Sequence, residues 1–259
     1  MKICIAGKNR ISVNSVEYLL NTLKLSRGDI LILPNDTDNG NDNWQPSLKR
    51  FAITNNLRIV KINEIYDLNE LVFFSLEYNR IIKPCRFKSN RLFNIHFSYL
   101  PSYKGMYTSV MPILFGEKET GVTLHKIDAG IDTGEIIDRI KFSIKISDTS
   151  RDLYFKYMDY GEKIFQKNIN LVLSDNYSLS PQKAKRSTYF SKNSINFNNV
   201  DIDFNKTSYE IHNQIRAFIF EEYQLPVIKG KRIKKSILTK EKIKINSFIS
   251  LNNKFNVSG

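Results

Sequence analysis

The sequence predicts an α/β protein with a mostly parallel sheet, followed by a small C-terminal α+β region. Short apolar runs alternate with longer amphipathic segments over the first two thirds of the chain, and after Pro112 the pattern changes to alternating strands. This order implies right-handed crossovers and a sheet that helices cover on both faces. The length of 259 residues, 41% of them hydrophobic, suits one or two globular domains and excludes a disordered chain.

The elements of the first two thirds follow from hydrophobic periodicity. Ser12 is the expected N-cap of a helix that ends near Leu25, and Pro46 suits the first turn of a helix that runs to about Asn56. Turn-rich residues 128–134 join the last two of the expected strands. Seven segments are typical of strands, namely residues 3–6, 30–33, 57–62, 71–76, 92–97, 121–127 and 136–144.

The last third of the chain begins with a long expected helix over residues 149–173. Residues 176–192 are rich in Ser, Lys, Pro and Tyr and are interpreted as a linker. Another amphipathic helix is expected over residues 207–220, and residues 233–251 look like short strands interspersed with Lys. We therefore expect one domain over residues 1–180 and a small region over residues 181–259.

The positive charge is concentrated in the C-terminal region. The net charge is +13, and residues 181–259 carry 15 basic and 6 acidic groups, hence +9 of it. Such a field attracts phosphates on nucleic acid, on a membrane or on a small substrate, and a composition rich in Lys, Asn and Ile is an equally good explanation. Residues 229–244 hold eight basic residues against Glu241 alone, which is typical either of a nucleic-acid-binding module or of a solvated strand edge.

The cysteines and the N-terminus indicate the class of protein. Cys4 lies in an apolar run and Cys85 follows a proline, so neither a disulfide framework nor a thiolate metal site is expected. The N-terminal apolar stretch is too short for a signal peptide, and no run of about 18 apolar residues occurs. We expect a cytoplasmic protein that binds no metal.

The turn after the first strand, Gly7-Lys8-Asn9-Arg10, has one glycine where a dinucleotide-binding motif needs three. A nicotinamide or flavin enzyme is therefore disfavoured. Lys8, Asn9 and Arg10 can still bind a phosphate at the start of a helix, or they can form a solvated turn.

Asn94 and His96 are the more informative pair. Side chains alternate along a strand, so these two lie on the same side, about 7 Å apart along the backbone. The loop that follows, residues 98–105, lies at the carboxyl edge of the predicted sheet, where open α/β folds bind ligands. From chemistry alone, a histidine in a strand can equally be a hydrogen-bonded core residue.

Three segments together resemble the active-site signature of the formyltransferases that use 10-formyltetrahydrofolate. They are Asn94-x-His96, Ser98-x-Leu100-Pro101-x-Tyr103-Lys104-Gly105 and Asp128-x-Gly130-Ile131-Asp132-Thr133-Gly134. Asp201-x-Asp203-Phe204 and residues 211–218 also resemble the segment that opens the C-terminal region of the family. The resemblance implies a Rossmann-like catalytic domain over residues 1–180, with Asn94, His96 and Asp132 as catalytic residues.

Within this family the sugar N-formyltransferases are the nearest match, by Met106-Tyr107-Thr108-Ser109, Trp44-Gln45-Pro46 and the short turn after the first strand. This implies a dTDP-linked 4-amino or 3-amino dideoxy sugar as acceptor, with dTDP-4-amino-4,6-dideoxyglucose expected, for lipopolysaccharide O-antigen synthesis. The C-terminal region is shorter than the barrel domain of the tRNA-directed relatives. It is expected to form the interface of a homodimer.

The resemblance also implies two binding regions. The folate would lie against Leu76, Glu77 and Tyr78 and against the turn that contains Asp128, Gly130 and Asp132. The sugar nucleotide would contact a second set, in which Trp44, Tyr189 or Tyr223 would stack on thymine. That set is Lys8, Asn9, Arg10, Trp44, Gln45, Tyr103, Lys104, Tyr189 and Tyr223.

The implied mechanism gives each catalytic residue a role. His96 accepts the proton of the attacking amine, Asn94 donates to the developing oxyanion, and Asp132 orients His96. His125 is expected to pack or to support the loop. The alternatives are a methionyl-tRNA formyltransferase, which the basic tail favours and the short turn after the first strand disfavours, and a 10-formyltetrahydrofolate hydrolase, which would normally carry an extra N-terminal domain.

Overall fold

The computed structural model describes residues 1–198, 200–239, 250–251 and 254–257. The chain forms two compact units. The first contains residues 1–104, 121–140 and 157–188, and the second contains residues 105–120, 141–156 and the described residues from 189 onward. In the described part of the chain, no helix is both long enough and apolar enough to cross a membrane.

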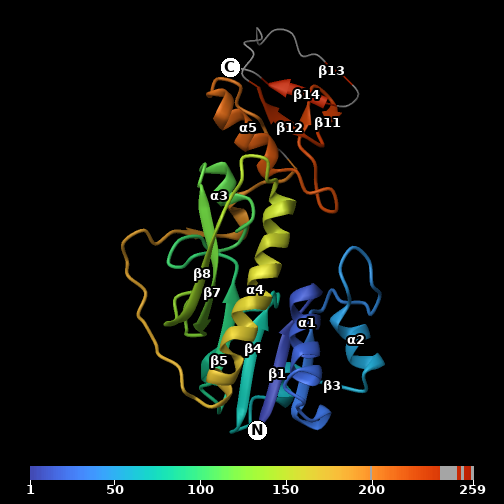
Figure 1. Ribbon diagram of the computed structural model, residues 1–259, viewed down its shortest axis with the longest axis vertical. Helices are drawn as coiled ribbons and strands as arrows, with labels where there is room; N and C mark the ends of the chain where they lie inside the picture. The colour runs from blue at the N-terminus through green and yellow to red at the C-terminus, as the bar shows by residue number, and fades with distance from the viewer. Residues whose placement is uncertain (199, 240–249, 252–253, 258–259) are drawn as a thin grey trace. The chain divides into compact units, whose positions relative to one another are not determined.

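A seven-stranded sheet with the order β3-β2-β1-β4-β5-β7-β8 organises the first unit (Figure 1). The first five of these strands pair in parallel, and β7 pairs antiparallel with β5, which confirms the mostly parallel α/β fold. The last residues of β8 belong to the second unit. The strands are β1 (Lys2–Gly7), β2 (Ile30–Pro34), β3 (Arg58–Ile59), β4 (Leu71–Leu76), β5 (Leu92–His96), β7 (Glu119–Lys126) and β8 (Ile136–Ser143).

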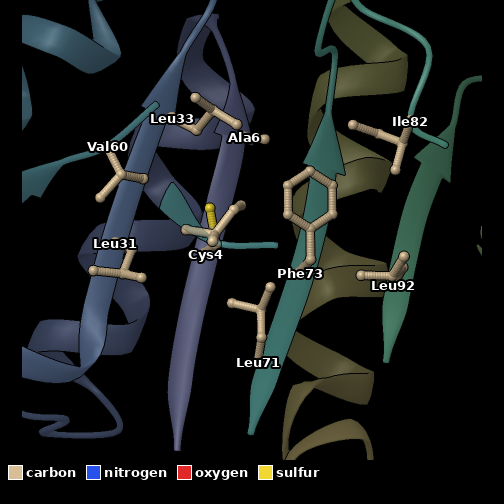
Figure 2. Close-up of a cluster of buried hydrophobic side chains, with 10 residues drawn as sticks. Cys4, Ala6, Leu31, Leu33, Val60, Leu71, Phe73, Ile82 and Leu92 are labelled. Carbon is tan, nitrogen blue, oxygen red and sulfur yellow. The ribbon is translucent and has the colours of Figure 1, made fainter. Parts of the chain in front are cut away.

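Both faces of the central strands are apolar, as expected for a parallel sheet covered on both sides. Figure 2 shows one face, where alternate residues of β1, β2, β4 and β5 form one cluster, among them Cys4, Leu31 and Phe73. Burial raises the pKa of the Cys4 thiol. On the other face Phe74 contacts Phe165 of helix α4 (Ser150–Leu173), with ring centroids 5.1 Å apart. The sheet core therefore fixes β4 and β5, whose ends carry the candidate site.

Ser12 is not the cap of the first helix, so this prediction was wrong. Helix α1 (Asn9–Asn21) has Lys8 at its N-cap position, four residues earlier, and ends before Leu25. The Ser12 hydroxyl is buried and donates to the carbonyl oxygen of Leu76 at 3.0 Å, and the Oε1 atom of Gln45 accepts from the Arg10 amide at 3.1 Å. A side chain distant in sequence thus caps the helix, which a local signal could not reveal.

The strand predicted over residues 57–62 is shorter than expected. Only β3 (Arg58–Ile59) pairs with β2, and the chain then turns into the 3-10 helix η2 (Ile62–Glu64). Helix α2 (Leu48–Thr54) precedes it, with Ser47 as N-cap, so Pro46 lies just before the helix. The other 3-10 turns are η1 (Arg27–Asp29), η3 (Pro84–Arg86) and η4 (Lys192–Ser194).

The segment interpreted as a linker, residues 176–192, is paired with other parts of the chain. Ser180 exchanges two backbone hydrogen bonds with Ile136 at the start of β8, at 2.8 and 2.9 Å. The short strand β9 (Tyr189–Phe190) pairs with β6 (Lys104–Gly105). Residues with turn-like composition therefore form fixed structure here, because their backbone groups find partners more than 40 residues away in the sequence.

The second unit has a small apolar core around helix α5 (Ser208–Ala217), which begins at a capping box between Thr207 and Glu210. Residues 240–249 lie outside the described residues. They include part of the predicted strand region, residues 233–251, and positions 240–244 of the basic run. The remaining elements are α3 (Met111–Leu114), β10 (Val227–Ile228), β11 (Lys231–Arg232), β12 (Ser236–Leu238), β13 (Ser250–Leu251) and β14 (Lys254–Val257). The strands β12, β14 and β13 form one sheet in that order.

His212 of α5 is buried in the second unit. Its Nε2 atom lies 2.9 Å from the carbonyl oxygen of Ile146, and its Nδ1 atom lies 2.7 Å from the hydroxyl of Ser236. Because a carbonyl oxygen only accepts, Nε2 carries the proton of the neutral ring and Nδ1 accepts from Ser236. Burial, together with the charge of Arg216, lowers the pKa of His212.

We expect His212 to make the protein less stable in mild acid. Its folded pKa is below the unfolded value of about 6.5, so its contribution is fully present above that pH and is lost as the pH falls toward the folded pKa. Thermal unfolding of the wild type and His212→Gln at pH 7.5, 6.5 and 5.5 tests this. The melting temperature of the wild type should fall further with pH than that of the variant, and equal pH dependences would contradict the assignment.

Candidate active site

Asn94 and His96 lie on the same side of β5, as the strand alternation predicts. On one side of β5, Ser75 of β4 is the register partner of Asn94, and on the other side His125 of β7 is its partner. Antiparallel partners have their side chains close together. The Nδ2 atom of Asn94 accordingly lies 3.1 Å from the Nε2 atom of His125.

The carboxylate of Asp132 joins these side chains. Its Oδ1 atom accepts from Nδ2 of Asn94 at 3.2 Å and lies 3.6 Å from Nε2 of His125, while its Oδ2 atom lies 3.4 Å from Nδ1 of His96. The two histidine side chains are buried, and the Asp132 side chain is 12% exposed. The structure therefore brings the three predicted catalytic residues together and adds His125 to them.

The contacts of His125 determine how it is protonated when neutral. Its Nδ1 atom lies 2.7 Å from the carbonyl oxygen of Lys126, which can only accept, so Nδ1 carries the proton. Nε2 then has the lone pair, and it accepts from the amide of Asn94. His125 therefore fixes the orientation of the Asn94 amide, with one N–H directed at His125 and the other at Asp132.

His96 has an oxygen opposite each ring nitrogen. Nε2 lies 2.8 Å from the carbonyl oxygen of Tyr103, and Nδ1 faces Asp132. Both contacts are hydrogen bonds only when the ring carries a proton on each nitrogen, that is, as an imidazolium paired with the carboxylate. To act as the base that the sequence predicts, the ring must give up one of these two contacts.

The turn of residues 128–134 positions Asp132. Asp132 itself has a positive φ of 54°, and a Cβ at Gly134 would lie 1.8 Å from the carbonyl oxygen of Lys126. The Oδ1 atom of Asp128 accepts from the Gly130 amide at 3.1 Å and from the Thr133 hydroxyl at 2.7 Å. Asp128 and Gly130, predicted to bind the folate, thus have a structural task in shaping the turn.

The predicted folate segment, residues 76–78, lies at the end of β4. Glu77 has a positive φ of 59°, and its carbonyl oxygen accepts from the side chain of Asn35 at 3.0 Å. Asn35 Oδ1 also accepts from the Asn79 amide, at 3.2 Å. Leu76 is fully buried, whereas Tyr78 is half-buried and burial raises its pKa. The segment thus has a fixed backbone shape at the carboxyl edge of the sheet.

The turn predicted to bind the sugar nucleotide is adjacent to the folate segment. Asn9 Nδ2 donates to Glu77 Oε2 at 3.2 Å, which links the two predicted binding regions. The guanidinium of Arg10 forms ion pairs with Asp159 and Glu162 of α4, and burial raises the pKa of Glu162. The charge of Arg10 is therefore already balanced, and Gln45 occupies the amide at the start of α1.

Two other predicted cations differ from Arg10. Neither Lys8 nor Lys104 forms an ion pair with any residue that the structure describes. The backbone amides of Tyr103 and Lys104 both donate to Thr188, which fixes the loop after β5. Among the predicted contacts to a phosphate, these two lysines have the most suitable electrostatics.

Three aromatic residues were predicted as stacking partners of thymine. Trp44 is half-buried, in the segment between β2 and α2. Tyr189 and Tyr223 belong to the second unit and are more than half exposed, and the Tyr223 ring packs against Phe220 with centroids 4.7 Å apart. The stacking role of all three stays a prediction.

Two residues of the site were missed by the sequence analysis. Asn35 directly follows the end of β2, and the carboxyl-edge rule that singled out residues 94–105 could have found it. Gln182 lies in the segment interpreted as a linker and donates to the carbonyl oxygens of Asp132 and Gly134. The composition of that segment gave no indication of a site residue. Among the described residues, no group of three His, Cys, Asp or Glu side chains is arranged to bind a metal ion.

A family model described as formyl transferase matches residues 69–169, which include Asn94, His96 and Asp132. The chain is 51% identical to an N-formyltransferase from Helicobacter canadensis, solved with folinic acid and dTDP-3-aminofucose. That match covers 98% of this chain and 94% of the other, with a TM-score of 0.94.

Two further relatives were found. The chain is 54% identical to WlaRD, a sugar 3N-formyl transferase solved in the presence of dTDP and 5-N-formyl-THF, over 98% of this chain and 92% of that one, with a TM-score of 0.94. It is 32% identical over 143 residues to a methionyl-tRNA formyltransferase from Fervidobacterium nodosum. That match covers 54% of this chain, and the chain spans only 44% of the length of that relative.

Proposed function

The chain belongs to the sugar N-formyltransferase family, and we propose that it transfers the formyl group of 10-formyltetrahydrofolate to the amino group of a dTDP-linked amino-dideoxy sugar. One observation carries this proposal. At the carboxyl end of β5, the side chains of Asn94 and His96 both lie against the carboxylate of Asp132. These residues lie within the part of the chain that matches the formyl transferase model.

Two relatives support one position for the amine on the sugar. From the sequence, dTDP-4-amino-4,6-dideoxyglucose is the expected acceptor. The two relatives described above, at 51% and 54% identity, support position 3 instead, since one was solved with dTDP-3-aminofucose and the other is described as a 3N-formyl transferase. We therefore place the acceptor amine at C3 of a dideoxy sugar.

The chemistry requires the polar network around Asp132 to open. The attacking amine loses a proton, and an oxyanion develops on the formyl oxygen. His96 takes the proton once a ring nitrogen is released from the Tyr103 carbonyl or from Asp132, and the proton passes to the departing N10 of the folate. Asn94 stabilises the oxyanion with the N–H that it directs at His125 or Asp132 in the absence of substrate.

The co-substrate and the nucleotide are assigned to adjacent parts of the sheet edge. We assign the folate to residues 76–78 and to the turn of residues 128–134, because side-chain hydrogen bonds hold the backbone of both segments in a fixed shape. Such preorganised backbone groups suit a flat heterocycle with many polar atoms. Lys8 and Lys104 are proposed to bind the diphosphate.

A methionyl-tRNA formyltransferase is less well supported. The methionyl-tRNA formyltransferases match at 32% identity over 54% of the chain or at 26% over 87% of it, whereas the two sugar N-formyltransferases match at 51% and 54% over 98%. The same three catalytic residues would serve either acceptor, so the network around Asp132 does not separate the two. The acceptor must be measured directly.

A substrate assay separates these acceptors. Purified protein should release tetrahydrofolate from 10-formyltetrahydrofolate when a dTDP-3-amino-3,6-dideoxy sugar is added, and release should be at least about tenfold slower with a 4-amino sugar, since misplacing the reacting atom by about 1 Å costs up to 10²-fold. The same release is measured with charged initiator tRNA as the acceptor and with no acceptor. Turnover with tRNA alone, or without acceptor, would overturn the proposal.

His96→Ala should separate chemistry from binding. We expect turnover to fall by about 10²- to 10⁴-fold, since the general acid–base group is lost, while the dissociation constant for dTDP stays within a factor of about two. Turnover is measured by stopped-flow absorbance and binding by calorimetry. His212→Gln, which changes a histidine of the second unit, is the matched control and should keep wild-type turnover at pH 7.5. Activity retained in His96→Ala would refute the role of His96.

We place the reaction in the cytoplasm, with the formylated sugar destined for a surface polysaccharide such as the lipopolysaccharide O-antigen. We expect a homodimer built through the C-terminal region, because strand sets as small as β10–β11 rarely stand alone and Val227 there is 52% exposed. Sedimentation velocity over a hundredfold range of concentration should detect it, and a monomer at every concentration would contradict it.

A further inference from the structure

We propose that Gln182 is a positioning residue that fixes the Asp132 carboxylate for formyl transfer, an inference that rests on the proposed function. Gln182 lies nine residues beyond the end of α4, in the segment interpreted from sequence as a linker. Its Nε2 atom donates to the carbonyl oxygen of Asp132 at 2.9 Å and to that of Gly134 at 2.8 Å. A primary amide has two N–H groups, and each here binds one carbonyl of the turn.

The orientation of this amide is set by the turn. Turning the group over would direct Oε1 at two carbonyl oxygens, so three acceptors would face one another. In the observed orientation Oε1 is buried and has no hydrogen-bond partner among the residues that the structure describes. A buried polar atom without a partner is unfavourable. The chain tolerates it here because both donors of the same group are used on the turn.

The turn needs this support because its backbone is strained. Asp132 is not a glycine, yet it has a φ of 54°, which L-residues seldom adopt. On the N-terminal side Asp128 binds the amide of Gly130 and the hydroxyl of Thr133. On the C-terminal side Gln182 binds the two carbonyls that flank Thr133. The two side chains together hold the turn from both ends.

The segment that carries Gln182 is itself anchored to the first unit. Ser180 exchanges two backbone hydrogen bonds with Ile136, two residues beyond Gly134. The ring of Tyr177 packs edge-on against Phe93 of β5, with centroids 5.5 Å apart. Gln182 therefore holds the turn between β7 and β8 in a fixed position relative to β5 and β8.

The consequence reaches the reacting groups through Asp132. Its carboxylate lies 3.2 to 3.6 Å from nitrogen atoms of Asn94, His96 and His125, so a small shift of the turn would change all three contacts at once. Catalytic geometry tolerates displacements of only about 0.5 Å. Gln182 should therefore affect the rate of the chemical step more than the binding of either substrate.

The first test is kinetic. Gln182→Met keeps the approximate size of the side chain and removes both donors, and Gln182→Glu replaces them with a carboxylate that repels the two carbonyls. We expect kcat to fall about 10- to 100-fold in the first variant and further in the second, with KM for both substrates within about a factor of three. Gln166→Met, at an exposed position of α4, is the matched control and should leave kcat unchanged.

The second test is spectroscopic and needs no substrate. The chain has three histidines, so each imidazole can be assigned in long-range proton–nitrogen NMR spectra by single substitution. In Gln182→Met the signals of His96 should shift, because its contact with Asp132 changes, whereas those of His212 in the second unit should not. If the wild type shows no formyl transfer at all, the proposed function fails and this spectrum still tests the role of Gln182.

Each other outcome decides against the proposal. An unchanged kcat in Gln182→Met, or a raised KM with an unchanged kcat, would overturn the positioning role. His96 signals identical to the wild type would do the same. A Gln182→Met protein that does not fold, judged by circular dichroism beside Gln166→Met, would show that the residue serves stability rather than catalysis.

Discussion

The carboxylate of Asp132 is the group on which the candidate active site depends. Oδ1 faces Asn94 and His125, and Oδ2 faces His96, so one side chain sets the positions of three others. Without a substrate, the Asn94 amide uses both its N–H groups, and both ring nitrogens of His96 face oxygen atoms. Catalysis therefore requires Asn94 and His96 to exchange some of these contacts for contacts with the substrates. The strained turn around Asp132 keeps its carboxylate in place while they do so.

The sheet explains why these groups meet. β5 is the strand at which the pairing changes, since it lies parallel to β4 and antiparallel to β7. The antiparallel register places His125 directly opposite Asn94, and the turn after β7 folds back so that the Lys126 amide donates to the carbonyl oxygen of Glu135. This fold of the turn places Asp132 next to β5. A wholly parallel sheet would have needed a long crossover at this position and would not have brought the turn back.

Much of the fold could be predicted from the sequence, because it depends on the periodicity of apolar residues within each segment. The apolar runs of β1, β2, β4 and β5 and the helical pattern of α4 are strong signals, as both faces of the central sheet are buried. One error occurs where a distant side chain replaces a local one, and another occurs at an edge strand. Gln45 caps α1 in place of Ser12, whose hydroxyl instead binds Leu76, and the edge strand β3 is shortened where the chain turns away from β2.

By itself the sequence determined the residue types of the site and their order, because Asn94, His96 and Asp132 belong to segments whose spacing resembles a known signature. Only the tertiary structure decided which nitrogen of each histidine faces which oxygen, that the Arg10 charge is balanced by α4, and that Gln182 binds the Asp132 turn. The physical reason is that these contacts join residues separated by as many as 152 positions or depend on the direction of a single N–H group. Hydrophobic periodicity reports neither.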